Sequence, residues 1–306
     1  LLVAEADESD GSFLRLSPTI VAVTNLDREH LDHYGSMERI NECFLEFINK
    51  VPFYGLAVLC ADDDRLRALF PNIVKRYQTY GLSERAGVAP DFFATDITLN
   101  QWGSEFRAQF RGRNLGPFRL AVPGRHNVSN ALVAIAIGIE LEVPVDLIRK
   151  ALAAYAGVER RFEVRGEPRG ILVVDDYGHH PTEIAAVLAA ARPLGRRVVV
   201  VFQPHRFSRT AALLSEFGPS FVGADCVVLT DIYGAGESPR PDATLDRLAT
   251  AIRQTSTVAV SVVPRLDDVP AAVVRIARPG DLVITLGAGS IGTLPARVIA
   301  ALEAAA

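Results

Sequence analysis

The histidines of this chain gather where an α/β protein could do chemistry. All six fall in four short segments, each at the end of an apolar run or the start of a helix-length stretch: His30, His33, His126, His179, His180 and His205. Imidazole can take up or release a proton near neutral pH. Ligands bind beyond the carboxyl ends of strands in open α/β sheets. The distribution therefore predicts a site built at strand ends.

The strongest signal comes from two segments in the second half of the chain, residues 175–183 (DDYGHHPTE) and residues 202–210 (FQPHRFSRT). Each is expected to end a strand and begin a helix, and the two strands are consecutive, so the two loops should share one edge of a sheet. We expect four side chains to converge there: His179, His205, Arg206 and Arg209. Paired arginines suit a carboxylate or phosphate. The alternative is that both loops are only structural.

Two segments of the first half could bind a cation. Residues 5–10 (EADESD) place four carboxylates directly after an expected strand at residues 1–4. Such crowding suits either Mg²⁺ or a solvated acidic loop, and the spacing favours neither. His30 and His33 would share a face of a helix and could bind a metal together. No further ligand follows at zinc spacing, and for His33 a capping or packing role is the stronger interpretation.

Two glycine-containing segments are ambiguous. Residues 124–131 (GRHNVSNA) lead into a helix, whose free N–H groups could hold an anion or polar ligand. From spacing alone, Asn127 is better interpreted as an N-cap. Residues 287–292 match G-x-G-x-x-G, but they lie too near the end of the chain for the returning strand and acid that a dinucleotide site requires. We interpret them as a tight turn that allows close approach of the backbone to a neighbour or ligand.

Composition limits the classes of protein that fit. The 306 residues suggest two domains, and 49% hydrophobic with 22% charged residues is typical of a soluble globular protein. No apolar run approaches the roughly 20 residues of a membrane helix, so we expect no membrane partner. A net charge of -4 argues against nucleic acid as a partner. The three scattered cysteines suit a reducing compartment, and we expect a cytoplasmic protein.

The order of apolar runs predicts an α/β fold in both halves. In the first we expect strands at 19–24 and 56–60, a helix at 37–49, an antiparallel layer over 92–120 with turns at 102–103 and 113–116, and a buried helix at 128–141. In the second we expect five strands of a doubly wound sheet, at 170–175, 197–202, 226–230, 258–262 and 281–286, and a closing helix at 294–306.

Taken together, the segments resemble the Mur ligases, the ATP-dependent amide-bond ligases of peptidoglycan assembly. The resemblance runs through the whole chain: residues 5–14, 23–35, 51–55, 124–131, 160–162, 175–184, 202–210, 231–237 and 287–289. Two of these segments, DDYGHHPTE and FQPHRFSRT, resemble those of the family member that adds L-alanine to UDP-N-acetylmuramate. The implied reaction proceeds through an acyl phosphate, with ATP and Mg²⁺ as cofactors.

The resemblance also implies a domain organisation. Residues 1–157 would form the central ATPase domain of P-loop type, a parallel sheet with a small antiparallel layer, and residues 158–306 a Rossmann-like doubly wound domain. Family members also have an N-terminal domain that binds the UDP-sugar and an ATP loop ending in Gly-Lys-Thr. No G-x-x-x-x-G-K-[ST] pattern occurs here. We therefore expect a truncated central domain, with little or no ligase activity in this chain alone.

Site residues follow from the same resemblance. It implies Mg²⁺ binding by Glu5 and His30, and contacts with ATP for Asn127, Arg161 and Asp176. The residues implied to face the amino acid are Tyr177, His179, Arg206 and Arg209, and those implied to act at the nascent bond are His179, His205, Arg206 and Arg209.

Two other functions stay open. The chain could be a non-catalytic binding remnant of a Mur ligase. It could also be a metal-dependent hydrolase that uses His30, His33, His179 and His180. The sequence does not determine the oligomeric state.

Overall fold

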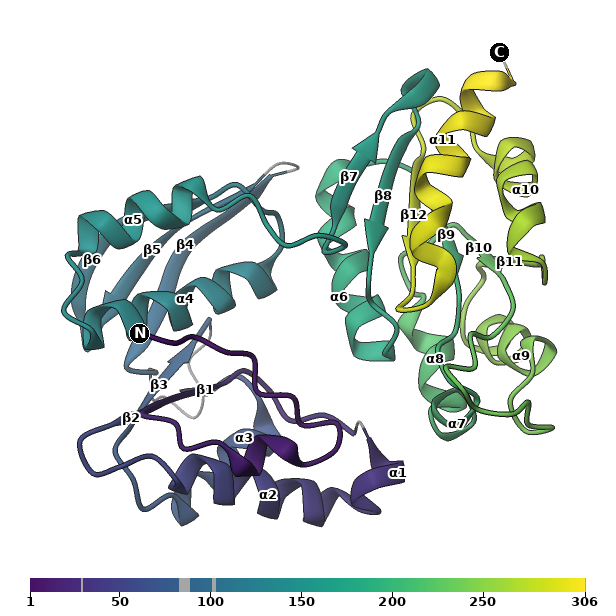
Figure 1. Ribbon diagram of the computed structural model, residues 1–306. Coiled ribbons are helices and arrows are strands. Elements are labelled where there is room, and N and C mark those ends of the chain that lie inside the picture. Colours follow the sequence, from purple (N-terminus) through teal and green to yellow (C-terminus); the bar gives the residue numbers. More distant parts are fainter. Residues whose placement is uncertain (29, 83–88, 101–102, 306) are drawn as a thin grey trace. The chain divides into compact units, whose positions relative to one another are not determined.

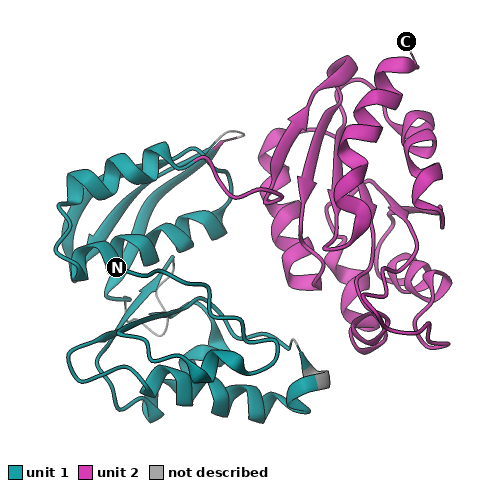
Figure 2. Cartoon of the chain, in the orientation of Figure 1, with its two compact units in different colours: residues 1–99, 103–155 teal, residues 100–102, 156–306 magenta. Residues whose placement is uncertain are grey.

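The computed structural model describes residues 1–28, 30–82, 89–100 and 103–305. The chain divides into two compact units (Figure 2). The first unit consists of residues 1–99 and 103–155, and the second of residues 100–102 and 156–306. Among the helices of the described residues, none combines the length and the apolar character needed to cross a bilayer.

The first unit is built on one six-stranded sheet, whose strands follow one another in chain order (Figure 1). They are β1 (Ile20–Val23), β2 (Leu56–Cys60), β3 (Tyr77–Gly81), β4 (Phe92–Asn100), β5 (Gly103–Phe110) and β6 (Arg113–Leu120). The pairs from β1 to β4 are parallel, and β5 and β6 are antiparallel. The strands expected at 19–24 and 56–60, and the antiparallel layer within 92–120, are therefore confirmed.

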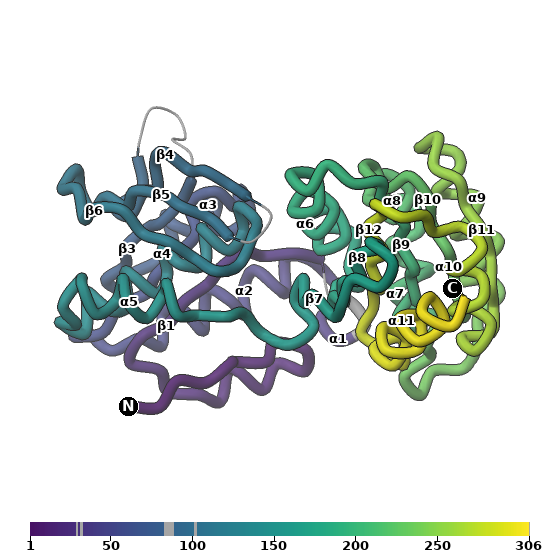
Figure 3. The backbone as a smooth tube through the Cα atoms, turned by 90° about the horizontal axis from the view of Figure 1, so that it is seen from above, coloured from purple at the N-terminus to yellow at the C-terminus, as the bar shows by residue number. Residues whose placement is uncertain are grey.

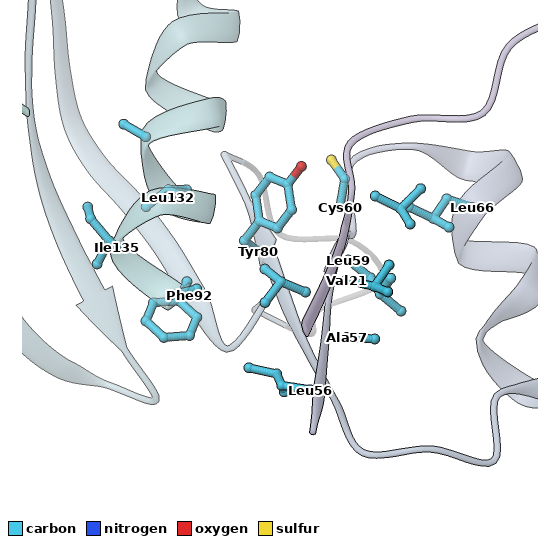
Figure 4. Close-up of a cluster of buried hydrophobic side chains, with 14 of the residues drawn as sticks. Val21, Leu56, Ala57, Leu59, Cys60, Leu66, Tyr80, Phe92, Leu132 and Ile135 are labelled. Carbon is cyan, nitrogen blue, oxygen red and sulfur yellow. The ribbon is translucent and has the colours of Figure 1, made fainter. Parts of the chain in front are cut away.

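Helices cover this sheet and complete its core. They are the 3₁₀ helices η1 (Ser12–Arg15) and η2 (Phe70–Asn72) and the α-helices α1 (Leu31–Tyr34), α2 (Met37–Asn49), α3 (Asp64–Leu69), α4 (Arg125–Glu140) and α5 (Val145–Ala154). Helix α2 has the expected bounds, because the Ser36 side chain caps its first turn by accepting a hydrogen bond from the Arg39 N–H. In the core, Tyr80 and Phe92 belong to one cluster with Leu132 of α4 (Figure 4).

Two expectations for the first unit are wrong. Residues 1–4 form no strand, because they pair with none of the described strands; Leu1, Leu2 and Val3 are 99%, 89% and 86% exposed. The acidic segment 5–10 therefore does not follow a strand.

Residues 113–116 form no turn but belong to β6, where the register shifts opposite Ala108 and Gln109. Gly116 at this bulge has φ +90°, and its N–H binds the Asn114 side chain. Trp102 of the other expected turn lies outside the described residues.

The second unit is a doubly wound sheet with strand order β11-β10-β9-β12-β8-β7. Five of its strands are the expected ones: β8 (Leu172–Asp176), β9 (Val198–Phe202), β10 (Cys226–Leu229), β11 (Ala259–Val262) and β12 (Leu282–Leu286). They pair in parallel, and the edge strand β7 (Glu163–Gly166), which we did not expect, pairs with β8 in the antiparallel direction.

Helices cover both faces of this sheet (Figures 1 and 3). One face packs against α6 (Pro181–Ala191), α8 (Leu214–Ser220) and α9 (Leu245–Thr255), and the other against α10 (Val269–Ile276) and α11 (Leu294–Ala304). The remaining helices are α7 (Phe207–Ala212) and the 3₁₀ helices η3 (Pro168–Gly170), η4 (Arg192–Leu194), η5 (Leu266–Asp268) and η6 (Ser290–Thr293). The expected closing helix at 294–306 is α11.

Candidate functional site

The candidate site lies where three neighbouring strands of the second unit end. Leu286, the last residue of β12, is in register with Asp176 at the end of β8 and with Phe202 at the end of β9. The loops that follow these strands are therefore neighbours, although they are far apart in the sequence. They carry His179, His205 and the glycine-rich turn after β12.

A row of aromatic rings forms at this edge. The His179 ring meets Tyr177 edge-on at 5.6 Å between centroids and lies 5.5 Å from the His205 ring. His205 in turn stacks on Tyr233, at 5.6 Å and with 16° between the ring planes. Arg209 reaches the same place, since its Nη1 lies 3.2 Å from His205 Nδ1. The structure thus brings together three of the four side chains that we expected to converge.

Arg206, the fourth, contributes to the site through its backbone and its charge. It precedes α7 as its N-cap residue, with φ +68°, and its backbone N–H donates to the Tyr233 carbonyl oxygen. Its positive charge is close enough to contribute to the low pKa of His205. Arg206 therefore positions the loop through its backbone, and its side chain adds positive charge beside the ring row.

Both histidines of the row are held neutral by their surroundings. Burial lowers the pKa of His179 to about 4, with Arg209 adding to this effect and Glu183 opposing it. Burial also lowers the pKa of His205 to about 4, and the neighbouring His179, Arg209 and Arg206 lower it further. At neutral pH the site therefore presents two uncharged imidazoles beside guanidinium groups.

The start of α6 fixes the first of these loops. His180 caps the helix and Glu183 completes a capping box, with its Oε2 accepting the N–H groups of His179 (2.9 Å) and His180 (3.1 Å). Pro181, the first helical residue, suits this position because it needs no N–H there. His180 is thus used for capping, and the loop conformation places His179 beside the other rings.

The glycine-rich turn allows the close approach that we expected of it. A Cβ atom on Gly289 would lie 2.6 Å from the Tyr233 ring and 2.7 Å from Gln203 Oε1, and Gln203 Oε1 accepts the Ile291 N–H at 2.9 Å. Gly287, with φ +148°, would meet the Gln203 carbonyl oxygen in the same way. These glycines let the loops after β9, β10 and β12 pack together.

Arginines from the start of the unit complete the surroundings of Tyr177. The guanidinium groups of Arg160 and Arg161 lie 5.2 and 5.6 Å from the centre of its ring. Arg161 Nη1 donates to Glu183 Oε1 at 3.2 Å. The predicted contact of Arg161 with a nucleotide stays a prediction, and its observed partners are Tyr177 and Glu183.

Asp176 is occupied within the second unit. Its side chain accepts the backbone N–H groups of Phe162 and Gly178, each at 2.7 Å, and the residue is 3% exposed. Burial raises its pKa to about 6 despite these hydrogen bonds. The geometry gives Asp176 a structural role, and its nucleotide contact remains a prediction.

Helix α4 of the first unit corrects our interpretation of Asn127. The helix begins at Arg125 with Gly124 as its N-cap, so Asn127 is not the cap, and its Nδ2 donates to the Pro123 carbonyl oxygen at 2.7 Å. Asn127 also lines an apolar cavity of about 580 Å³ between α4, α5 and the end of β6.

The residues implied for Mg²⁺ do not fit an ion site as they stand. Glu5 is exposed, and His30 lies with its Nε2 3.7 Å from Glu8 Oε1 instead. His30 precedes α1 with φ +54°, so it shares no helical face with His33, whose ring packs edge-on against Tyr34. Within the described ranges, no three His, Cys, Asp or Glu side chains are placed to hold a metal together. We derive no step through this ion.

Sequence reasoning missed three residues of the site. Arg160 was available as the neighbour of Arg161, Glu183 stands at capping-box spacing from His180, and Tyr233 lies in the segment 231–237. The capping-box spacing was a usable signal for Glu183. Tyr233 follows β10, which pairs with β9, so the edge of the sheet that carries His205 was a usable signal for Tyr233 as well.

Comparison with known families identifies the two halves. Residues 2–138 match the Mur ligase middle domain, and residues 160–289 match the glutamate ligase domain of the Mur ligases. The chain belongs to the Mur ligase family.

Its relatives include enzymes named UDP-N-acetylmuramate–L-alanine ligase. The one from Pelobacter propionicus is 53% identical over 294 residues, with 95% of this chain and 63% of the relative covered. The one from Solibacter usitatus is also 53% identical, with 95% and 61% covered. A solved structure of UDP-N-acetylmuramate-alanine ligase from Thermotoga maritima has a TM-score of 0.77 at 25% identity, with 98% of this chain and 63% of that chain covered. The chain thus spans less than two thirds of these proteins.

Proposed function

We propose that this chain acts in the ATP-dependent ligation of L-alanine to UDP-N-acetylmuramate, a step of peptidoglycan biosynthesis in the cytoplasm. The observation that carries the proposal is the ring row of His179 and His205 with Arg209 beside it, at the ends of β8 and β9. The likeness to relatives with this printed activity supports it.

The chemistry of amide formation explains why such a site is useful. A carboxylate does not acylate an amine in water, because oxide is a poor leaving group, and conversion to an acyl phosphate lets phosphate leave instead. The amino acid must then present its uncharged amine. Arg209, with Arg206, would hold the carboxylate of alanine and orient the amine. A neutral imidazole beside it could accept the amine proton.

The cofactors belong to the proposal as well. We propose ATP as the phosphate donor, with Asn127, Arg161 and Asp176 as the predicted contacts. Mg²⁺ is the second proposed cofactor, and Glu5 and His30 stay its predicted ligands, although the described residues do not place them with a third ligand. Family likeness supports both cofactors.

Binding of L-alanine tests the proposed site. We expect millimolar L-alanine to shift the imidazole NMR signals of His179 and His205, and Arg209→Ala to weaken binding at least about tenfold, because a charge-assisted hydrogen bond is lost. Arg247→Ala, on the exposed face of α9, is the matched control and should bind normally. The proposal fails if L-alanine leaves both histidines unperturbed, or if the two variants bind alike.

A second experiment separates a ligase from a binding remnant. Because the sequence holds no Gly-Lys-Thr loop to hold the phosphates, we expect this chain alone to release little or no phosphate from ATP in a single turnover with L-alanine and UDP-N-acetylmuramate. Rapid release that depends on both substrates would contradict this expectation. Binding of L-alanine without turnover, even after a complete ATP loop is supplied, would favour the remnant.

A further inference from the structure

The two imidazoles of the ring row have different hydrogen-bonding surroundings at Nδ1. For His179, Nδ1 lies 3.1 Å from the Tyr177 carbonyl oxygen and 3.5 Å from Glu183 Oε2. Both neighbours are acceptors: a carbonyl oxygen cannot donate, and an ionised carboxylate cannot either. A lone pair at this nitrogen would face two other lone pairs. The hydrogen of the neutral ring therefore belongs on Nδ1.

His205 is in the opposite situation. Its Nδ1 lies 3.2 Å from Arg209 Nη1, and a guanidinium group has donors but no acceptor. This Nδ1 must therefore accept the hydrogen bond with its lone pair. In a neutral imidazole the hydrogen is then on Nε2, so the free nitrogen of His205 is a donor.

We propose that Glu183 and Arg209 hold His179 and His205 in opposite tautomers, so that the site offers a substrate one imidazole acceptor, His179 Nε2, and one imidazole donor, His205 Nε2–H. Glu183 is then a positioning residue of the site. The use of this acceptor and donor on an amino acid rests on the proposed function.

Several features make this arrangement stable. Tautomers exist only in the neutral ring, and burial keeps the pKa of both histidines well below neutral. The groups that face His179 are Glu183, Arg209, His180, His205 and the Tyr177 ring. Those that face His205 are His179, Arg206, Arg209, Glu237 and the Tyr233 ring.

Glu183 is itself rigidly held. Its Oε2 accepts the N–H groups of His179 and His180, and its Oε1 accepts Arg161 Nη1. Burial raises the pKa of Glu183, but the neighbouring His179 ring and these three donors lower it below its usual value, so Glu183 stays an acceptor at neutral pH. The carboxylate that caps α6 therefore acts together with the Tyr177 carbonyl oxygen in favouring the Nδ1–H tautomer of His179.

The pair of tautomers matches what acyl transfer to an amine needs. The amine nitrogen gives its electron pair to the acyl carbon, the bond from that carbon to the phosphate oxygen breaks, and phosphate leaves with the pair. The proton lost by the nitrogen goes to His179 Nε2. His205 Nε2–H would donate to an oxygen of the amino acid or of the acyl group. Two rings of the same tautomer would supply only one of these roles.

NMR of the chain with ¹⁵N-labelled histidine tests the proposal without any ligand, since long-range ¹H–¹⁵N correlations distinguish the tautomers. We expect the Nδ1–H pattern for His179 and the Nε2–H pattern for His205. Glu183→Gln keeps a side chain that suits the capping box. It removes the negative charge 3.5 Å from His179 Nδ1 and should shift the tautomer ratio of His179 about tenfold toward Nε2–H. His205 should not change.

Glu303→Gln, at an exposed position of α11, is the control and should alter neither ring. The proposal is overturned if both histidines of the unchanged chain show one tautomer, or if folded Glu183→Gln leaves His179 unaltered. The measurement in the unchanged chain stands even if the variant does not fold. The NMR experiment contains no L-alanine. Failure of L-alanine to bind would therefore contradict the proposed function without changing the tautomers that are measured.

Discussion

Replacing Arg160 by leucine is expected to lower the free energy of unfolding of the second unit by about 3 kcal/mol, because it leaves a buried carboxylate without its counter-charge. Arg160 Nε donates to Asp175 Oδ2 at 2.8 Å, and the Asp175 side chain is 1% exposed. The second Asp175 oxygen keeps only the hydroxyl of Thr285, at 2.6 Å. Arg160 Nη2 also binds the Gly287 carbonyl oxygen, so the glycine-rich turn loses a partner too. Urea denaturation, with amide exchange of β8 and β12 as the local reporter, measures the loss.

A nearby exposed ion pair provides the control for this prediction. Arg165 lies 2.9 Å from Glu163, but both side chains are partly exposed, so Arg165→Leu should cost less than about 1 kcal/mol. In the Arg160→Leu chain, a further Asp175→Asn change should restore part of the stability, because it removes the buried charge. Equal losses from Arg160→Leu and Arg165→Leu would contradict the buried-charge explanation.

The second large effect is a loss of stability on acidification. The pKa of His179 falls from 6.5 in the unfolded chain to about 4 in the fold, so between these values the unfolded state binds more protons. The contribution of His179 to the free energy of unfolding is therefore fully present above pH 6.5 and is lost as the pH falls toward 4. The titration of His179 alone lowers the free energy of unfolding by about 2 kcal/mol between pH 7 and pH 5. His205 shifts in the same direction, with a smaller contribution because it is less buried.

Asp176 works against this trend. Its pKa rises from 3.8 to about 6, so the folded state binds more protons between these values, and acidification to pH 5 adds stability of about 1 kcal/mol. We expect a net loss between pH 7 and pH 5 in urea denaturation. In His179→Gln the loss should be at least halved, and in Asp176→Asn it should grow. A loss of the same size in all three chains would contradict this assignment.

Strands with both faces buried could be predicted from the sequence. Every residue of β2, β8, β9 and β12 is buried, and such strands appear as continuous apolar runs. The edge strand β7 alternates between charged and small residues and exposes Val164, so it resembles a loop. Strand β3 (YQTYG) buries Gln78 and has no apolar run either. Only pairing with neighbouring strands makes these two segments extended.

For the candidate site, the convergence of side chains could be predicted from the sequence, but their backbone conformations could not. The rule that loops after parallel strands lie at the same edge of a sheet was enough to predict that His179, His205 and Arg209 converge, although β12 separates β8 from β9. Backbone conformation was not predictable: Arg206 and His30 have positive φ, and His30 thereby leaves the helical face that it was expected to share with His33. For Glu5, an expected strand that did not form removed the argument for its position. The spacing of residues predicts the direction of their side chains only where the expected helix or strand forms.

The position of β12 has a consequence for how the second unit is made. This strand lies between β8 and β9 in the sheet, yet it follows every other described strand of the unit along the chain. Until residues 282–286 emerge, no strand joins β8 to β9, and the backbone N–H and C=O groups along their facing edges stay unpaired. The unit therefore cannot close its sheet before residue 286 has been synthesised, and a nascent chain stalled before residue 282 would be a target for chaperones and proteases.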